Sequence, residues 1–399
     1  MTHILYISYD GMLEPLGQSQ VLAYLKRLAN GRRIHLISFE KADDWANVAE
    51  RVRLARDIAS AGIAWHPLRY HKTPSVLATA FDIMQGIIVG VWLCVRYKIK
   101  IIHARSYIPS VIALMLKKLF NVKYIFDMRG FWADERIDGG LWPKGGRIYR
   151  VAKWFEKRFL LSADSVVSLT NAAVDEMKKF DYLQGRLPNF KVITTCTDLN
   201  LFDFKKTNIN NSSKESFVVG YVGSVGVWYL FDETLNCFKL ILEKVPSAQL
   251  HIINRGGHQY IRERLIDKRI NPNKVMIETS DHAGVAKAMQ SMDVGIFFIK
   301  PVYSKMSSAP TKLGEFLGCG IPCLSNTKVG DMAVILNDEK VGVALDSFDE
   351  TSMKLGIEEL MTLLNDPEIR ERCRSTALKY FSLDIGVRSY NHIYNRLIS

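Results

Sequence analysis

The stretch "SSAPTKLGEFLGCGIPCLSN" (307–326) places several reactive side chain types at helical spacing. We expect Ser308 to be the N-cap of a short helix that carries Pro310 in its first turn. Gly318 and Gly320 are expected to end this helix before a buried strand. The helix would therefore present its N-terminus at the end of a serine-rich loop.

The polar face of this expected helix carries a hydroxyl, an amine and a carboxylate. Ser308, Thr311 and Glu315 fall on one exposed face, with Lys312 beside them. The free amides at the N-terminus, with Ser308, Thr311 and Lys312, suit a diphosphate. Glu315 lies one turn deeper, where its two oxygens suit a ribose diol. A capped amphipathic helix with a hydrated polar face is the alternative.

A second glycine-containing loop follows the strand pattern "FVVGYVG", within "GYVGSVGVWYLFDE" (220–233). Glycine allows the backbone to approach a ligand closely, so Gly223 and Ser224 are candidate contacts for the same diphosphate. Trp228 and Tyr229 could stack on a sugar, or they could be buried against the sheet.

Two other loops also follow expected strands. Gly17, in "DGMLEPLGQSQ", opens a helix whose amides could contact an anion, and Gln18 is a candidate contact for the acceptor or sugar. A flexible turn is as good an explanation of Gly17. Glu278 and Ser280 follow "KVMI", and we place the base of a bound nucleotide near them.

The segment "FDMRGFWADERIDGG" (126–140) concentrates charges beside large aromatic residues. Asp127 could act as a base or orient a hydroxyl, and Arg129 could neutralise a phosphate or fix Asp127. Trp132 is a candidate acceptor contact. The alternative is a surface ion-pair network that pins the loop.

The elements that must position these residues alternate between strands and helices along the chain. Such alternation predicts an α/β protein with two tandem doubly wound, Rossmann-like parallel sheets, and ligands then bind at the carboxyl ends of the strands. The polar stretch "FKKTNINNSSKES" suggests a boundary between domains. We expect domains at 1–205 and 206–382, facing a cleft, and a final helix at 383–399 that returns to the first domain.

Composition narrows the class of partner. The chain has 399 residues and a formal net charge of +12, which favours an anionic partner. No arginine-rich arm or RNA-binding aromatic motif is present, so nucleic acid is the weaker option. Six scattered cysteines without metal-ligand spacing suggest reduced thiols and a cytoplasmic location. The apolar run at 83–95 looks too short to span a membrane, and we expect a buried or interfacial helix.

These motifs together resemble the GT-B glycosyltransferases of the retaining family 4 group. The block "DVGIFFIKPVYSKMSSAPTKLGEFLGCGIPCLSN" is similar to that family's P-T-K-x-x-E donor-binding segment. "YVGSVGVWY" resembles its glycine loop, "NDPEIRERCRSTALKYFS" its late helix, and "VRSYNHIYNRLIS" its terminal helix. The resemblance runs over essentially the whole chain.

Two positions depart from the family's pattern. The family carries two glutamates eight positions apart; Glu315 matches the second, but Ser307 stands at the first. Arg129 stands where the family often has a histidine near the reacting sugar. The handling of the transferred sugar is therefore less well supported than the binding of the nucleotide.

The resemblance implies a hexosyltransferase-type enzyme that moves a sugar from a nucleotide-diphosphate sugar to an acceptor hydroxyl, with retention and without a metal or other cofactor. It implies an acceptor-binding first domain and a donor-binding second domain, in polysaccharide or glycolipid assembly. A sugar-nucleotide epimerase or hydrolase, and a nonenzymatic sugar-nucleotide-binding protein, are the alternatives. Basic stretches with apolar neighbours ("VRYKIK", "LKKLF") suggest peripheral contact with an anionic membrane that carries a lipid-linked acceptor.

Overall fold

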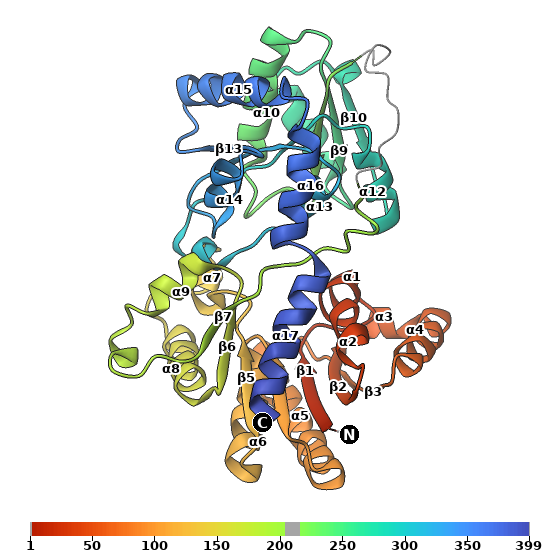
Figure 1. Ribbon diagram of the computed structural model, residues 1–399, viewed down its shortest axis with the longest axis vertical. Helices are drawn as coiled ribbons and strands as arrows, with labels where there is room; N and C mark the ends of the chain where they lie inside the picture. Colours follow the sequence, from red (N-terminus) through yellow and green to blue (C-terminus); the bar gives the residue numbers. More distant parts are fainter. Residues whose placement is uncertain (1, 204–215, 399) are drawn as a thin grey trace. The chain divides into compact units, whose positions relative to one another are not determined.

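The computed structural model describes residues 2–203 and 216–398 (Figure 1). The chain forms two compact units: unit 1 comprises Met1–Thr194 and Leu383–Ser399, and unit 2 comprises Thr195–Ser382. The expected boundary at 205/206 lies outside the described residues. Leu199 and Phe202 belong to the hydrophobic core of unit 2, so the described residues 195–203 pack with unit 2 rather than with the first domain.

Unit 1 is built on a parallel sheet of seven strands in the order β3-β2-β1-β4-β5-β6-β7. The central strands are almost completely buried, as expected when helices cover both faces. The strands are β1 (Thr2–Ser8), β2 (Arg32–Glu40), β3 (Ile63–Arg69), β4 (Ile101–Arg105), β5 (Lys123–Asp127), β6 (Ser165–Ser168) and β7 (Phe190–Val192).

The helices of unit 1 divide between the two faces of this sheet. Right-handed crossovers place the helices that follow β3, β4 and β5 on one face and those that follow β1 and β2 on the other. The helices are α1 (Pro15–Gly17), the π-helical η1 (Gln18–Leu22), α2 (Ala23–Leu28), α3 (Ala42–Ala46), α4 (Val48–Ser60), α5 (Ser75–Tyr97), α6 (Tyr107–Phe120), α7 (Trp132–Asp138), α8 (Arg147–Ser162), α9 (Asn171–Met177), η2 (Asp181–Leu183) and α17 (Leu383–Ile398). As expected, α17 belongs to unit 1, where it packs against α2 and β4.

Unit 2 contains a parallel sheet of six strands in the order β10-β9-β8-β11-β12-β13. Its strands are β8 (Val218–Val222), β9 (Gln249–Ile253), β10 (Val275–Glu278), β11 (Val294–Ile296), β12 (Cys323–Asn326) and β13 (Gly342–Leu345). Its helices are α10 (Phe231–Lys244), α11 (His258–Asp267), η4 (Pro272–Lys274), α12 (His282–Met289), η5 (Tyr303–Ser307), α13 (Thr311–Gly318), α14 (Met332–Asp338), α15 (Glu350–Leu364) and α16 (Ile369–Tyr380). The predicted α/β class with two doubly wound sheets is confirmed.

Helix α5 covers residues 75–97, the range over which the alternating pattern predicts a helix, and only its length relative to the apolar run differs from the expectation. It extends over 23 residues, well beyond the apolar run at 83–95, because flanking residues continue the helix in both directions. By length and composition it could cross a membrane, and 28% of its most apolar window is buried within the protein. The expectation that this segment is too short was therefore wrong for the helix as a whole.

Candidate functional site

A pocket of about 470 Å³ opens in unit 2 at the carboxyl ends of β8, β9 and β10. It is lined by residues of the segments 222–225 and 253–257, together with Ser280, His282, Val285 and Glu315. Three loops that are far apart in the sequence thus meet beside α13. The structure brings together four of the predicted contacts: Gly223, Ser224, Ser280 and Glu315.

Asn254, which the sequence reasoning missed, connects two of these loops. Its Nδ2 donates to the Gly223 carbonyl at 2.8 Å, and its Oδ1 accepts from the amides of Gly256 at 3.0 Å and Gly257 at 2.5 Å. Because Asn254 is buried at the end of β9, these bonds are shielded from water and fix the loop backbones. A polar residue at the end of an apolar strand was the available signal.

Gly223 has a φ of 115°, which disfavours any residue with a side chain. A Cβ atom at this position would also lie 2.8 Å from the Lys312 Nζ atom. The glycine therefore leaves room for the ammonium group beside the loop that lines the pocket.

Lys312 is a buried cation, only 6% exposed. Among the described residues, Nζ has no hydrogen-bond partner. It lies 3.9 Å from the centre of the Tyr229 ring and 5.3 Å from that of Tyr221. Burial lowers the pKa of this amine to about 7, although the Glu315 carboxylate opposes the shift. An anion bound beside Gly223 would supply the missing partner.

Glu315 lines the pocket with an exposure of 8%. Its Oε1 lies 3.4 Å from the Nε2 of His282, whose ring packs against Phe202. The polar face of α13 was predicted to be exposed, and this is wrong: Lys312 and Glu315 are both buried. Residues distant in sequence, such as Tyr229, cover the face that a single helix appeared to leave open.

The start of α13 also differs from the prediction. Ser308 is not its N-cap: the preceding residues form η5, and the Ser308 amide donates to the Lys305 carbonyl. Pro310 occupies the N-cap position without a side-chain bond, and the helix begins at Thr311. Neither Ser308 nor Thr311 lines the pocket, so their contacts with a diphosphate stay predictions.

The C-terminal end of α13 agrees with the expected glycines. Gly318 is the last helical residue, and Gly320, with a φ of 73°, turns the chain toward β12.

Ser307, at the position of the first family glutamate, is 2% exposed. Its Oγ donates to the Ser304 carbonyl at 2.7 Å, so the hydroxyl is directed into the protein. The neighbouring Lys305 places Nζ 3.7 Å from the centre of the Trp228 ring. This segment therefore has a buried serine where the family has a carboxylate, and its Lys305 amine lies over the Trp228 ring of the glycine loop.

Trp228 and Tyr229 each contact a lysine, Lys305 and Lys312 respectively. Tyr229 is further fixed by bridges to Gly226 and Ile299. These contacts occupy one face of each ring, and sugar stacking by either residue stays a prediction. Glu278 does not line the pocket; its Oε1 lies 3.1 Å from the Nε2 of His251.

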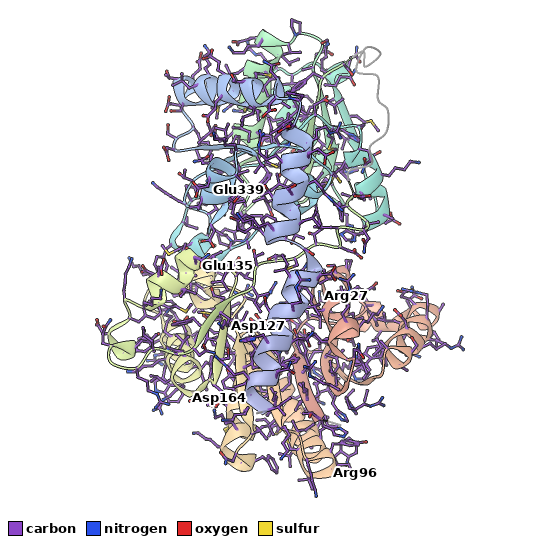
Figure 2. The ribbon with its side chains drawn as sticks, in the orientation of Figure 1. Arg27, Arg96, Asp127, Glu135, Asp164 and Glu339 are labelled. Atoms are coloured by element: carbon purple, nitrogen blue, oxygen red, sulfur yellow. The ribbon has the colours of Figure 1, made fainter. Side chains whose placement is uncertain are left out.

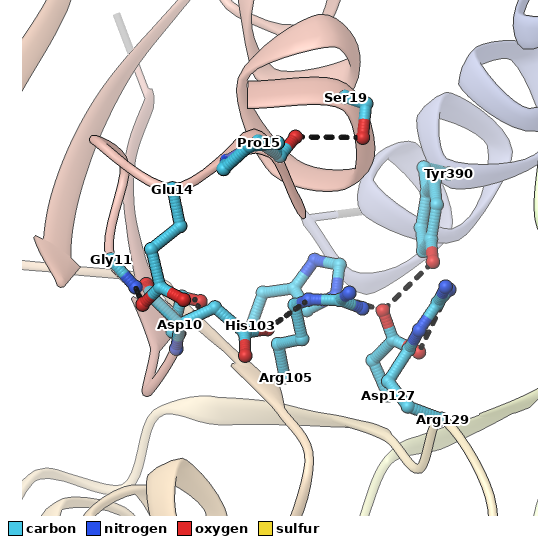
Figure 3. A network of polar contacts seen from close by, with 11 residues as sticks. Asp10, Gly11, Glu14, Pro15, Ser19, His103, Arg105, Asp127, Arg129 and Tyr390 are labelled. Carbon is cyan, nitrogen blue, oxygen red and sulfur yellow. Dashed lines mark hydrogen bonds and ion pairs between the residues drawn. The ribbon is translucent and has the colours of Figure 1, made fainter. Parts of the chain in front are cut away.

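Unit 1 contains a separate buried cluster around Asp127, which is 1% exposed and lies beside α17 (Figures 2 and 3). The Tyr390 hydroxyl donates to Asp127 Oδ2 at 2.9 Å, and the Nε2 of His103 lies 3.4 Å from the same oxygen. Arg129 Nη1 lies 4.0 Å from Oδ1. Burial raises the pKa of Asp127, but Arg129 and His103 outweigh it and lower the pKa to about 2. Asp127 is therefore an ionised carboxylate that orients its neighbours.

One residue just after β4 and one just after β5 have a positive φ, which is strained for a residue with a side chain. Arg129, just after β5, has a φ of 58°, and Ser106, just after β4, has a φ of 74° with a ψ of −171°. Such backbone costs on the order of 1–3 kcal/mol per residue. Five other non-glycine residues among those described also have a positive φ, so the strain does not single out Arg129, and its catalytic role stays a prediction.

Arg105 lies beside this cluster and was missed by the sequence reasoning. It is 4% exposed, its Nε bonds the Asp10 carboxylate at 3.2 Å, and Nη1 has no partner among the described residues (Figure 3). It ends the fully buried strand "IIHAR". A charge at the carboxyl end of a buried strand was the signal that could have identified it.

The remaining candidates of unit 1 have structural contacts. Gly17 lies so close to Gly11 that a Cβ atom would be 2.0 Å from the Gly11 carbonyl oxygen, so packing requires glycine there. The Gln18 side chain reaches the Leu13 carbonyl at 3.5 Å.

The aromatic and acidic residues after β5 pack within the same unit. Trp132 packs against Tyr107 and Trp142. Asp134 accepts from Tyr149 and Lys153, at 2.8 and 3.0 Å. Trp132 and Asp134 lie in α7, and Asp134 is buried, so these contacts form a buried network rather than the surface network of the alternative interpretation. An acceptor contact by Trp132 stays a prediction.

Within residues 2–203 and 216–398, no group of three or more histidine, cysteine, aspartate or glutamate residues could hold a metal ion. The expectation that no metal or other cofactor is needed is not tested by this observation.

Comparison with known proteins connects this geometry to a class. Solved structures with the same architecture include a glycosyltransferase from Rickettsia africae (TM-score 0.72, 14% identity, 100% of this chain and 99% of that chain). Sucrose-phosphate synthase from Thermosynechococcus elongatus is similar (TM-score 0.72, 13% identity, 100% of this chain and 99% of that chain). HepE of Anabaena in complex with UDP and glucose is also similar (TM-score 0.67, 13% identity, 99% of this chain and 100% of that chain). The fold is therefore that of GT-B glycosyltransferases. Comparison with curated protein sequences gives no match.

Two family models match most of the chain between them. Residues 20–186 match the glycosyl transferase 4-like domain, and residues 203–380 match the glycosyl transferases group 1 domain. The chain belongs to the family 4-like GT-B glycosyltransferases, and it is an enzyme of that class.

Proposed function

We propose that this enzyme transfers a hexosyl group from a nucleotide-diphosphate sugar to an acceptor hydroxyl, with retention of anomeric configuration. The observation that carries the proposal is the buried amine of Lys312, which has no hydrogen-bond partner within residues 2–203 and 216–398 and lies beside the glycine loop of a pocket that Glu315 also lines. A diphosphate neutralises that charge, and a ribose one helical turn away matches the carboxylate.

The donor is proposed to occupy the unit 2 pocket. Lys312 does not itself line the pocket, but its Nζ lies directly behind Gly223, and we assign the diphosphate to this amine and to the Gly223–Ser224 backbone. Glu315 accepts hydrogen bonds from the ribose hydroxyls, and Ser280 lies at the base. HepE was solved with UDP and with UDP-glucose, and TarM of S. aureus with UDP. We therefore propose a uridine diphosphate sugar as the donor.

Catalysis on this proposal is stabilisation of the leaving group. The bond between the sugar C1 and the diphosphate oxygen breaks, and the acceptor oxygen bonds C1 on the same face. The acceptor proton passes to the departing diphosphate. Lys312 stabilises the charge that develops on that diphosphate, so no metal ion is required.

Unit 1 is proposed to bind the acceptor. Arg129 contacts the reacting groups, and Asp127 is a positioning residue that holds its guanidinium. The acceptor is a glycan or glycolipid, which suits polysaccharide or glycolipid assembly at the cytoplasmic side of a membrane.

The test begins with binding. Calorimetric titration with UDP, ADP, GDP and TDP should show UDP as the tightest ligand, and Glu315→Gln should weaken UDP strongly. Glu358→Gln, an exposed glutamate on α15, is the matched control and should leave binding unchanged. Equal binding of UDP by wild type and Glu315→Gln would overturn the ribose assignment.

Turnover distinguishes the reaction types. UDP-sugars incubated with glycan and lipid-linked acceptors should yield a glycosylated product whose anomeric configuration, measured by NMR, equals that of the donor. Altered or hydrolysed donor without an acceptor product would instead support the epimerase or hydrolase alternative. A product of inverted configuration would refute retention.

A further inference from the structure

We propose that the outer surface of α5, α6 and α8 in unit 1 lies on an anionic lipid bilayer, with α5 parallel to the membrane surface. These helices cover one face of the unit 1 sheet, and each packs against the next. The inference goes beyond the proposed function because it concerns a surface that takes no part in binding the nucleotide.

Helix α5 presents an apolar stripe along its whole length. Its large exposed side chains are spaced three or four residues apart, as on one face of a helix, and are between 43% and 69% exposed. They are Leu77, Phe81, Met84, Ile88, Trp92 and Val95, and the adjacent Val76, 61% exposed, lies beside the start of the stripe. A stripe of this length on a monomer marks an interaction surface rather than scattered surface residues.

The opposite face of α5 is fixed to unit 1. Gly86 and Gly90 allow close packing on α6: a Cβ atom at either position would approach Ile112 or Leu116 within 2.6 Å. Asp82 is fully buried and accepts hydrogen bonds from Tyr9 at 2.8 Å and His71 at 2.6 Å. A helix anchored this way exposes one side only, so it lies on a membrane rather than spanning it.

Neighbouring helices extend the apolar surface. Met115 and Leu119 of α6 are 42% and 59% exposed, and Val151 and Trp154 of α8 are 54% and 51% exposed. Trp154 lies under the Arg158 guanidinium at 4.9 Å, an amphipathic pair suited to the headgroup region.

The charge of this surface has one sign. The acidic residues of the three helices are Asp82 and Glu156, and both are fully buried. Their exposed charged side chains are all basic: Arg96, Lys118, Arg147, Arg150, Lys157 and Arg158. Arg96 lies at the C-terminal end of α5 (Figure 2).

The positive charge of this surface distinguishes between two possible partners, a second copy of the chain and an anionic bilayer. A second copy would bring two basic rims together in a symmetric interface, which is unfavourable. Anionic headgroups neutralise the same rim while the acyl boundary takes up the apolar stripe. The surface therefore fits an anionic bilayer better than a copy of itself.

The test is co-sedimentation of the full chain with vesicles of phosphatidylcholine, with and without phosphatidylglycerol. Binding should need the anionic lipid and fall at high salt. Leu77→Glu/Ile88→Glu should lower the partition coefficient more than tenfold, and Arg150→Gln should lower it about fivefold, the effect typical of one basic residue at an anionic surface. Leu355→Glu, an equally exposed leucine of α15 in unit 2, is the matched control and should bind as wild type.

Two outcomes would overturn the proposal: no preference for anionic vesicles, or equal loss of binding by Leu355→Glu. A wild type that is dimeric by light scattering and becomes monomeric on Leu77→Glu/Ile88→Glu, without vesicle binding, would assign the surface to a second copy. Thermal melting of each variant shows that it is folded. Vesicle binding needs no nucleotide, so its failure is distinguishable from failure of the proposed transferase reaction.

Discussion

The two units each bury charged side chains near the carboxyl ends of their strands, but the charges are satisfied differently. In unit 1, Asp127 is enclosed by His103, Tyr390 and Arg129, and its exposure is 1%. In unit 2, Lys312 is buried against aromatic rings without a hydrogen-bond partner in the described chain, next to an open pocket. The first arrangement stabilises the folded unit, and the second is completed by a ligand.

The largest expected effect is on the stability of unit 1. Asp127→Asn leaves Arg129 buried without its counter-charge, so the free energy of unfolding should fall by about 3–5 kcal/mol. UDP affinity should be unchanged. Urea unfolding and calorimetry measure the two quantities. The control Asp384→Asn removes an exposed ion pair with Arg27 and should cost less than about 1 kcal/mol. If Asp127→Asn instead weakened UDP binding and left the free energy of unfolding unchanged, the Asp127 cluster would not be the structural counterpart of the Lys312 site.

Lys312→Met should weaken UDP binding and leave the stability of the protein unchanged, the reverse of the effects expected for Asp127→Asn. Loss of a charge-assisted hydrogen bond to phosphate of about 1.5–3 kcal/mol should weaken UDP binding roughly 100-fold. The free energy of unfolding should not fall, because no bonded partner is left behind. Lys287→Met changes an exposed lysine on α12 and should leave both quantities unchanged. Destabilisation by Lys312→Met would mean that the ammonium is already satisfied in the unliganded protein.

The pKa of Lys312 predicts a pH dependence of UDP binding. Because burial lowers this pKa to about 7, the amine of the free protein is neutral above pH 7 and must take up a proton to bind an anion. The dissociation constant should therefore rise about tenfold per pH unit above that value. Calorimetry of Lys312→Arg, which stays charged, should show a flat profile if it binds. A slope retained in Lys312→Arg would assign the titration to another group.

Ser106→Gly should stabilise unit 1. Glycine adopts the backbone of this position without strain, so the free energy of unfolding should rise by about 1 kcal/mol, the lower end of the cost of such backbone. Ser60→Gly, in the ordinary helical backbone of α4, should instead lower it by about 0.5–1 kcal/mol. Equal losses in both variants, measured by urea unfolding, would show that the backbone at Ser106 is not strained.

The smallest expected effect is that of His282. Its contact with Glu315 is partly exposed, so His282→Ala should weaken UDP binding about 1.4- to fivefold, corresponding to roughly 0.2–1 kcal/mol. Calorimetry measures the change, and His392→Ala on α17 is the exposed control. A loss as large as that of Lys312→Met would make His282 a principal contact of the nucleotide.

The sequence predicted the elements better than their surroundings. Alternating apolar strands and amphipathic helices located α5, α10 and the two parallel sheets, because periodicity is a local property. Glu315, on a helix, and Gly223, at the end of a strand, were both predicted as contacts of one ligand, and both line the pocket. Their contacts with a donor stay predictions.

Long-range contacts account for what was not predicted. The exposed face assigned to α13 is buried because Tyr229, more than eighty residues earlier, lies against Lys312. Ser308 looked like a cap, but the η5 turn before it depends on the surrounding loop. Arg105 and Asn254 gave little signal, since one polar residue at a strand end becomes meaningful only when its neighbours are known.

The bonds of Asn254 have a consequence for engineering this enzyme. Its side chain bonds the carbonyl of Gly223 and the amides of Gly256 and Gly257, so the two loops that line the pocket are fixed relative to each other. Grafting one loop from a relative would misplace the other. A change of donor preference will therefore require that both loops are exchanged together, with Asn254 retained because it fixes one loop to the other.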